Sequence, residues 1–362
     1  MAFSVSEMSR RAFLGSAGGA ILASTLPKFA RAAAGTPRRV ILDTDPGVDD
    51  AMAIFLALRS PEVKVEAITV VAGNVPLPLT LPNALRLVEI AGRPDIPVAA
   101  GASAPLIRRL VTAKYAHGNN GLGGVEFAEP KLKPVNESAV QLMSRVVHNN
   151  PGEITIVALG PLTNVATALV SEPSLASRIE NIVVMGGSLT GGNITPAAEF
   201  NFYVDPEAAR IVFDAGVPLT MVGLHVTSRV QMHDEQIRVL GAAQNPVSQA
   251  AGKIMRATLD RWQKERKITG FGMHDPLTMA YVIDPSILTL KDYYVQIETM
   301  GELTAGESVA YSRAPRLSPP LNSVAPVDET PEGEFRPNCR VAVEADADKF
   351  FHLLLSRLTA GS

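Results

Sequence analysis

Short runs of aliphatic and β-branched residues alternate with helical stretches between residues 40 and 222, and this alternation constrains the fold more than any other feature. The apolar runs typical of buried strands lie at residues 40–42, 63–71, 96–99, 153–159, 182–185 and 217–222. Helical stretches lie at residues 51–58, 81–91 and 138–148, and residues 205–207 have the composition of a helix start. The pattern predicts a Rossmann-like α/β fold, a mostly parallel sheet with helices on both faces.

The pattern changes after about residue 230, where it becomes mainly helical. Residues 295–311 predict a hairpin. Residues 314–337 are rich in proline and lack periodicity, which is typical of a surface loop; a domain linker is the alternative. Only one strand and one helix follow, too little for a domain. We therefore expect one domain over residues 35–362, with helical and loop insertions.

The composition excludes several classes of partner and site. The net charge is only −3, from 33 basic and 36 acidic residues, so nucleic acid and stable membrane association are not expected. Cys339 is the only cysteine, which excludes an intrachain disulfide and a cysteine-based zinc cluster. Beyond the N-terminal segment, no run approaches the ~18 apolar residues of a membrane span.

The N-terminal residues 1–34 resemble a bacterial twin-arginine export signal followed by a short linker. Arg10-Arg11 precedes Phe13-Leu14, an apolar stretch and the small-residue sequence Ala30-Arg31-Ala32, where cleavage is expected. A basic tail ahead of a cytoplasmic enzyme is the alternative. We expect export to the periplasm.

Four aspartates, Asp43, Asp45, Asp49 and Asp50, lie within eight residues after the first strand. One acidic side chain is enough to cap a helix N-terminus, whereas four neighbouring carboxylates repel and each loses hydration in a cleft. A hard cation bound through oxygen resolves both problems. The carboxyl end of a strand is also where open α/β sheets bind ligands.

The spacing excludes two common cation or phosphate loops. An EF-hand counted from Asp43 needs glycine and glutamate where the chain has Val48 and Ile54, and no P-loop lysine follows. Asp43-Thr44-Asp45 is also similar to the start of haloacid-dehalogenase-type phosphatases. Those enzymes usually place threonine or valine where this chain has Gly47.

The octapeptide Asp43-Thr44-Asp45-Pro46-Gly47-Val48-Asp49-Asp50 is similar to the signature of inosine–uridine-preferring nucleoside hydrolases. Further matching motifs occur in the same order: residues 71–74, 117–121, 159–164, 185–187, 199–201, 205–209 and 274–276. The resemblance implies the nucleoside hydrolase fold, a ribonucleoside substrate, hydrolysis of its N-glycosidic bond to ribose and free base, and self-association as a dimer or tetramer.

The resemblance also implies a calcium site built from Asp45, Asp50, Asp275 and the backbone carbonyl of Leu159. These are all oxygen ligands, which suits Ca²⁺. Asp45 would also be the general base that activates a calcium-bound water. For Asp275, a helix cap before Pro276 is the structural alternative.

The remaining implied site residues bind substrate or protonate the leaving base. Asp49, Asn74 and Asn201 are expected on the ribose hydroxyls, and Asn193 and Glu199 toward the 5′-hydroxyl. His274 is the candidate acid for the departing base. His117 lies in a Gly/Asn-rich loop that could close over the site.

Residues 255–267 lack the tyrosines associated with purine-preferring relatives, so the preferred base stays open; Trp262 and Phe271 are possible substitutes. Two other functions stay open as well. One is a periplasmic ribose- or nucleoside-binding protein without turnover, against which the candidate acid His274 argues. The other is the phosphatase.

Overall fold

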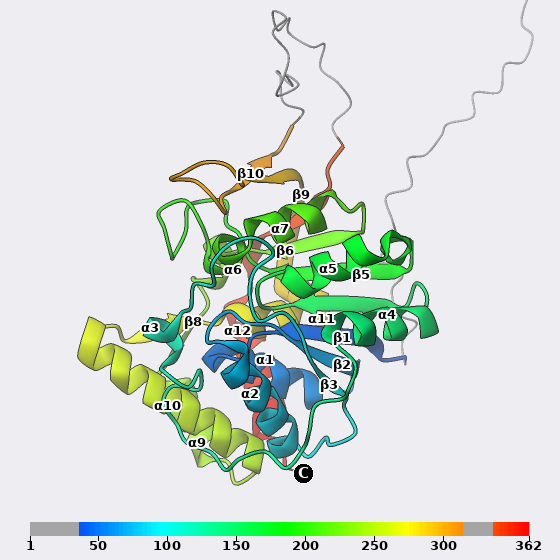
Figure 1. Cartoon of the computed structure of the whole chain (residues 1–362). Coiled ribbons are helices and arrows are strands. Elements are labelled where there is room, and N and C mark those ends of the chain that lie inside the picture. Colours follow the sequence, from blue (N-terminus) through cyan, green and yellow to red (C-terminus); the bar gives the residue numbers. More distant parts are fainter. Residues whose placement is uncertain (1–35, 314–335, 362) are drawn as a thin grey trace, which may run out of the picture.

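The computed structural model describes residues 36–313 and 336–361, whose main feature is one nine-stranded sheet (Figure 1). In spatial order its strands are β10 (Ser308–Tyr311), β9 (Leu288–Ile297), β11 (Cys339–Ala345), β6 (Leu219–Val222), β5 (Ile179–Met185), β4 (Ile154–Ala158), β1 (Arg38–Thr44), β2 (Val63–Val70) and β3 (Val98–Ala100). Neighbours from β11 to β3 run parallel, and β9 is antiparallel to β10 and β11. The predicted mostly parallel sheet is confirmed.

Helices cover both faces of the sheet, and alternate residues of β1 enter different hydrophobic clusters. Val40 and Leu42 belong to one cluster and Ile41 to the other, as the two-residue period of a strand requires. The first cluster includes α1 (Val48–Leu58), α2 (Leu77–Ile90), α9 (Asp234–Ala242), α10 (Pro246–Arg266), α11 (His274–Ile283) and α12 (Ala347–Thr359). The second includes α4 (Ala139–Asn149), α5 (Thr163–Ser171) and α7 (Pro206–Asp214).

Five short elements complete the region that forms the site. They are α3 (Lys114–His117), α6 (Phe200–Val204), α8 (Leu224–Thr227) and a separate antiparallel pair, β7 (Gln231–His233) and β8 (Gly270–Gly272). Two 3₁₀ turns, Pro173–Ser177 and Pro285–Ile287, connect longer elements.

Several predicted boundaries were wrong for local reasons. The helix predicted from residue 81 begins at Leu77, because Pro78 lies in the first turn, where backbone N–H groups need no helical partner. The strand predicted from residue 96 begins after Pro97, which has no N–H for the ladder. The predicted hairpin is confirmed as β9–β10, but β9 starts earlier because it also pairs with β11.

The predictions for residues 1–34 and for most of the loop 314–337 concern residues outside the described ranges. Among the helices that are described, none combines the length and apolar character needed to cross a membrane.

The sheet reverses its strand order at β1. Strand β2 pairs with one edge of β1, while β4, reached only after β3, pairs with the other edge. The helices that follow diverge, since α1 packs on one face and α5 on the other. A crevice is expected where chains diverge in this way at the carboxyl ends of parallel strands.

Candidate active site

A cleft of about 740 Å³ opens at the carboxyl ends of the central strands. Its inner wall includes Asp49, Asn74 and Asp275, and its outer wall includes Trp262 and Arg266. Most sequence-predicted site residues line it, namely Asp49, Asn74, His117, Leu159, Asn193, Glu199, Asn201, His274 and Asp275. The predicted residues Asp45 and Asp50 are fully buried directly beside them.

Three carboxylates from two helix starts converge on one point. Asp49 and Asp50 lie in the first turn of α1 and Asp275 in the first turn of α11, and one oxygen of each lies within 4.8 Å of the others. All three are buried. The positive ends of two helix dipoles thus face the cluster, which partly offsets the repulsion among the carboxylates.

Burial raises the pKa of each carboxyl group in this cluster. The pKa values of Asp49 and Asp50 rise to about 6, and the negative charge of Asp49 adds to the effect of burial on Asp50. The pKa of Asp275 is raised further, by burial and then by the charges of Asp49, Asp50 and Asp45. A bound cation would reverse these shifts, because it favours the ionised carboxylates.

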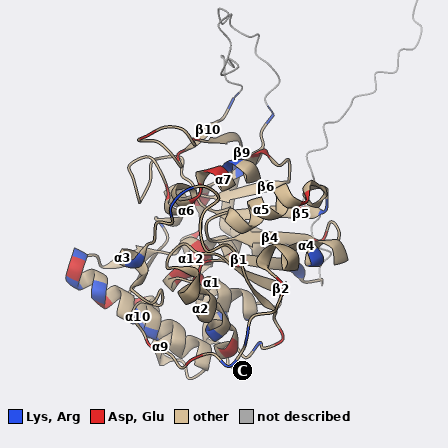
Figure 2. Ribbon diagram, in the orientation of Figure 1, with Lys and Arg blue, Asp and Glu red and all other residues tan. Residues whose placement is uncertain are grey.

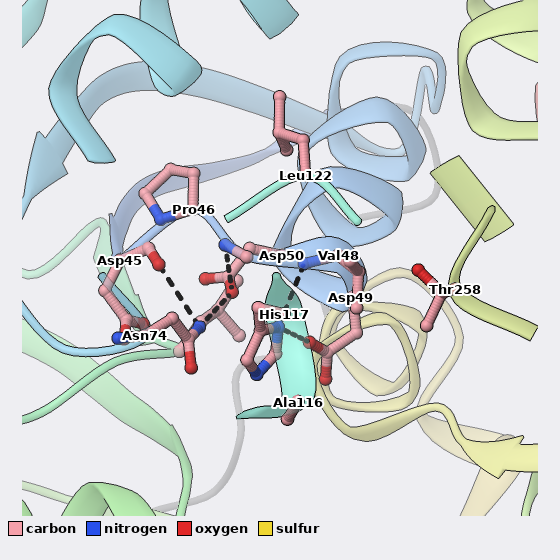
Figure 3. Close-up of polar contacts among 12 residues, drawn as sticks. Asp45, Pro46, Val48, Asp49, Asp50, Asn74, Ala116, His117, Leu122 and Thr258 are labelled. Atoms are coloured by element: carbon pink, nitrogen blue, oxygen red, sulfur yellow. Dashed lines mark hydrogen bonds and ion pairs between the residues drawn. The ribbon is translucent and has the colours of Figure 1, made fainter. Parts of the chain in front are cut away.

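Asp45 lies just outside this group of three but is connected to it through Asn74 (Figure 3). The backbone N–H of Asn74 donates to Asp45 Oδ2 at 2.6 Å, and its side-chain Nδ2 donates to the Asp45 carbonyl and to Asp50 Oδ2, at 3.2 and 2.9 Å. Among the described residues, Asp45 Oδ1 is buried without a hydrogen-bond partner. Burial, followed by the charge of Asp50, raises the pKa of Asp45 well above its usual value.

Thr44 and Gly47, in the same turn, hold the Asp50 carboxylate and leave space for His117. Thr44 Oγ1 and the Gly47 N–H both donate to the Asp50 carboxylate. A Cβ at Gly47 would lie 2.4 Å from His117 Nδ1 and 2.6 Å from Asn74 Nδ2, so no larger residue fits there without displacement. The octapeptide is therefore shaped by packing as well as by charge.

Asn201 and Glu199 stand at the opposite wall of the cleft. Asn201 Nδ2 donates to the carbonyl oxygens of Leu159 and Met185, at 2.8 and 3.1 Å. Glu199 caps the N-terminus of α6 and accepts hydrogen bonds from the backbone N–H groups of Gly187, Asn201 and Phe202 at 2.9–3.2 Å. Burial nevertheless raises the pKa of Glu199 to about 7.

Asn193, in the loop before α6, likewise both lines the cleft and binds the backbone at the start of α6. Its Oδ1 accepts the backbone N–H of Phe200 at 2.9 Å, and the residue lines the cleft. Both residues predicted to face the 5′-hydroxyl therefore also hold the chain around the start of α6.

The two predicted site histidines are partly exposed, but their pKa values are lowered, which favours the neutral form. His117 Nδ1 accepts the Val48 N–H at 3.1 Å, so it carries no proton, and burial lowers its pKa to about 3 (Figure 3). Its 3.8 Å approach to Asp49 Oδ1 is therefore not an ion pair. His274 Nδ1 lies 2.7 Å from Thr227 Oγ1, and burial lowers its pKa to about 4.

Several residues at or near the cleft were not predicted from the sequence, or were predicted without a position in the site. Thr227 is 47 positions from His274, and a lone threonine at the end of a short helix carried no signal. Trp262 and Phe271 were considered without a register; both line the outer cleft, with ring centroids 5.5 Å apart. Asp43, although part of the acidic run, does not line the cleft; its Oδ1 accepts from Thr69 and Asn164 at 2.6 and 2.8 Å.

Comparison with known proteins is consistent with this geometry. The sequence model of the family described as inosine–uridine preferring nucleoside hydrolase matches residues 40–352. The pyrimidine-specific ribonucleoside hydrolase RihA of Citrobacter koseri is 44% identical over 321 residues, which cover 88% of this chain and 97% of that protein.

Two solved structures have the same fold. The plant nucleoside hydrolase PpNRh1 has a TM-score of 0.81 and 37% identity, over 90% of this chain and all of its own. The purine-preferring ribonucleoside hydrolase from Gardnerella vaginalis has a TM-score of 0.78 and 29% identity, over 89% of this chain and 98% of its own.

Proposed function

Because the chain belongs to the inosine–uridine preferring nucleoside hydrolase family, we propose that it hydrolyses ribonucleosides to ribose and free base in the cleft below β1 and β4. The observation that carries the proposal is the convergence of Asp49, Asp50 and Asp275, with Asp45 and the Leu159 carbonyl beside them. Such an oxygen-rich, buried and negatively charged pocket fits a metal-assisted reaction on a polyhydroxylated substrate.

Calcium is the metal we propose for this site. The candidate ligands are the carboxylates of Asp45, Asp50 and Asp275 and the carbonyl of Leu159, all hard oxygen donors, with no thiolate among them. The Asp45 Oδ1 without a partner among the described residues and the raised pKa values of the cluster fit a cation bound at this position. When bound, the ion would supply a Lewis acid that acidifies water and orients the ribose hydroxyls.

The side chains divide the remaining chemistry among themselves. Asp45 removes the proton from the attacking water, while Asp49, Asn74 and Asn201 hold the ribose as positive charge develops on its ring. Asn193 and Glu199 bind the 5′-hydroxyl, and His117 closes the cleft beside Asp49.

His274 completes the reaction at the leaving base. Thr227 Oγ1 lies 2.7 Å from His274 Nδ1. We propose that the hydroxyl donates to Nδ1, which leaves the proton of the neutral imidazole on Nε2. A hydrogen bond from that N–H to the departing base strengthens as negative charge builds up on the base, which is the condition for acid catalysis.

Pyrimidine nucleosides are the preferred substrates in this proposal. The relatives that share 42–44% identity over 97% of their own length are named as pyrimidine-specific. The purine-preferring neighbour from Gardnerella vaginalis is more distant, at 29% identity.

One assay panel tests the function. Purified protein is incubated with uridine, cytidine, inosine and a phosphate ester, and free base and free phosphate are measured. We expect free base from nucleosides, fastest from uridine or cytidine, and no phosphate. Tight nucleoside binding without turnover would instead indicate a binding protein, and phosphate release would indicate a phosphatase.

We further propose that residues 35–362 form a single catalytic domain. We also propose that the protein is exported through the twin-arginine route and loses residues 1 to about 32, because Arg10-Arg11 is followed by an apolar stretch and a small-residue sequence. Replacing both arginines with lysine should trap the precursor in the cytoplasm. Unchanged periplasmic yield would argue against export by this route.

Self-association as a dimer or tetramer is proposed from the family resemblance, and sedimentation equilibrium measures it.

A further inference from the structure

Three side chains at the end of α10 contact the short helix α3, which lies beside the cleft. Arg261 donates from its terminal NH₂ group, and Trp262 from Nε1 at 3.3 Å, to the same acceptor, the carbonyl oxygen of Ala116. Four residues further on, Arg266 donates to the Tyr115 carbonyl at 3.1 Å. Three donors thus meet two carbonyls of a helix that has only four residues.

Aromatic contacts support the same junction. The Arg266 guanidinium lies 5.1 Å from the Trp262 ring centroid and 5.4 Å from that of Tyr115, within cation–π range of both. The Trp262 ring in turn packs edge-on against Phe271, which lines the cleft. The end of α10 is therefore connected to α3 on one side and to the cleft wall on the other.

The loop after α3 also rests on α10. Gly123 has a φ of +69°, and a Cβ at this position would lie 2.7 Å from Thr258 Oγ1 of α10. Its backbone N–H donates to the carbonyl of His117 at 2.9 Å. Both sides of His117 are thus held by segments in contact with α10.

A four-residue helix cannot hold its own position, because an isolated helical turn is unstable in water. His117 is the last residue of α3, and it reaches the Val48 N–H and Asp49 only while α3 stays in place (Figure 3). We infer that Arg261 and Trp262 are positioning residues, which clamp α3 through the Ala116 carbonyl and so hold His117 against the substrate end of the cleft.

This inference rests on the proposed nucleoside hydrolysis only for its kinetic test. Loss of the clamp should weaken substrate binding more than the chemical step, because the clamp acts through His117 and leaves the acidic cluster untouched. For Arg261→Met we expect KM for uridine to rise about tenfold with kcat changed less than threefold, as suits one hydrogen bond from a charged donor. Arg261→Lys, which keeps a charged donor, should recover most of the loss.

A double-mutant cycle separates positioning from general damage. His117→Ala alone should raise KM at least as much as Arg261→Met, and adding Arg261→Met to it should have little further effect. Trp262→Phe, which keeps a ring but removes the donor, should raise KM about threefold. Arg256→Met on the same helix is the matched control, because Arg256 pairs with Asp234 instead and should leave KM unchanged.

Trp262 is the only tryptophan of the chain, so its fluorescence reports on the clamp without any turnover. Acrylamide should quench this emission more strongly in Arg261→Met than in wild type or Arg256→Met. Equal quenching in all three proteins, or additive KM effects in the double mutant, would overturn the inference. Absence of nucleoside turnover by wild type would contradict the proposed function instead, and the quenching result would still decide whether the clamp exists.

Discussion

Two buried aspartates, Asp205 at the start of α7 and Asp45 directly after β1, differ in how the protein accommodates their charge. Asp205 is fully buried, and its carboxylate accepts from the Leu106 N–H, Thr163 Oγ1 and the Ala208 N–H at 2.7–3.0 Å. Asp45 is equally buried, but its Oδ1 has no partner among the described residues, and it faces other carboxylates.

The difference teaches how to separate structural from functional burial in this protein. Burial raises the pKa of both residues, so a shifted pKa alone does not distinguish them. At Asp205 the hydrogen bonds that stabilise the charge come from the protein, at the start of α7. Asp50 also accepts protein hydrogen bonds, but it lies beside Asp49 and Asp275, and Asp45 Oδ1 has no partner among the described residues. This uncompensated charge is the reason for proposing a cation and a substrate at that group.

The charge pattern of the ribbon supports this contrast. Figure 2 shows Lys and Arg residues on α4 and both basic and acidic residues on α10. The acidic residues of α1, Asp49 and Asp50, are buried. No basic side chain is among the causes of the pKa shifts of Asp45, Asp50 or Asp275.

The largest expected effect is complete loss of turnover on removal of calcium. Exhaustive chelation should abolish uridine hydrolysis, and adding calcium back should restore it and raise the midpoint of thermal unfolding, since a ligand that binds only the folded state stabilises it. Elemental analysis must confirm metal loss. Full activity in the metal-free protein would remove the distinction between Asp45 and Asp205.

Asp45→Asn should lower kcat/KM by at least ~10³-fold on every nucleoside, because it weakens the metal site and removes the base. The free energy of unfolding of the metal-free protein should not fall, since the change removes repulsion from Asp50 and Asp49. Steady-state kinetics and urea unfolding in chelator measure the two quantities. A clear loss of metal-free stability would place Asp45 with the structural carboxylates.

His274→Ala should have a smaller and substrate-dependent effect. We expect a ~10²–10⁴-fold loss on uridine, the usual range for acid catalysis, but little loss on a nitrophenyl riboside, whose leaving group is already a stable anion. Asp45→Asn should impair both substrates alike, because both need water. Equal losses on the two substrates in His274→Ala would assign the histidine to packing.

Asp205→Ala should show the opposite profile to Asp45→Asn. It leaves two backbone N–H groups and the Thr163 hydroxyl without an acceptor, so the free energy of unfolding should fall by about 1–3 kcal/mol. The kcat of the folded fraction should stay within about threefold of wild type. Unchanged stability in urea would show that the hydrogen bonds of this carboxylate add nothing.

A pH dependence of the unfolding free energy is expected from Asp43, which shares features of both Asp205 and Asp45. Burial raises its pKa from 3.8 to about 7, and its Oδ2 lacks a partner among the described residues. Between pH 3.8 and 7 the carboxyl group is protonated in the folded protein but ionised in the unfolded chain. Its contribution to the free energy of unfolding is therefore fully present below pH 3.8 and is lost as pH rises through 7.

The unfolding free energy of the metal-free protein should therefore fall as pH increases from 4 to 7, with Asp43 contributing at most ~1.4 kcal/mol per pH unit. Asp43→Asn, which mimics the protonated carboxyl, should flatten this slope. Urea unfolding of both proteins across that range gives the comparison. Identical slopes would mean that another group carries the dependence.

Much of the fold was predictable from periodicity, because the burial pattern of each strand and helix is visible in its own local sequence. The strand predicted over residues 153–159 forms as β4, whose residues are all buried. The acidic octapeptide was expected after the first strand, but β1 extends through Asp43 and Thr44, so only its last six residues follow the strand. Boundaries at Leu77 and Val98 were missed because the effect of a proline depends on its position within the element, which composition does not give.

The sequence by itself determined the α/β class, the turn that carries Asp45 to Asp50, and the kind of chemistry that four adjacent carboxylates demand. Only the tertiary structure decided that β4 pairs with β1, that Thr227 lies against His274, and that Arg261 reaches Ala116. The physical reason is the range of the interactions. Strand and helix patterns are local, whereas strand order and side-chain convergence depend on how the whole chain packs its two hydrophobic clusters.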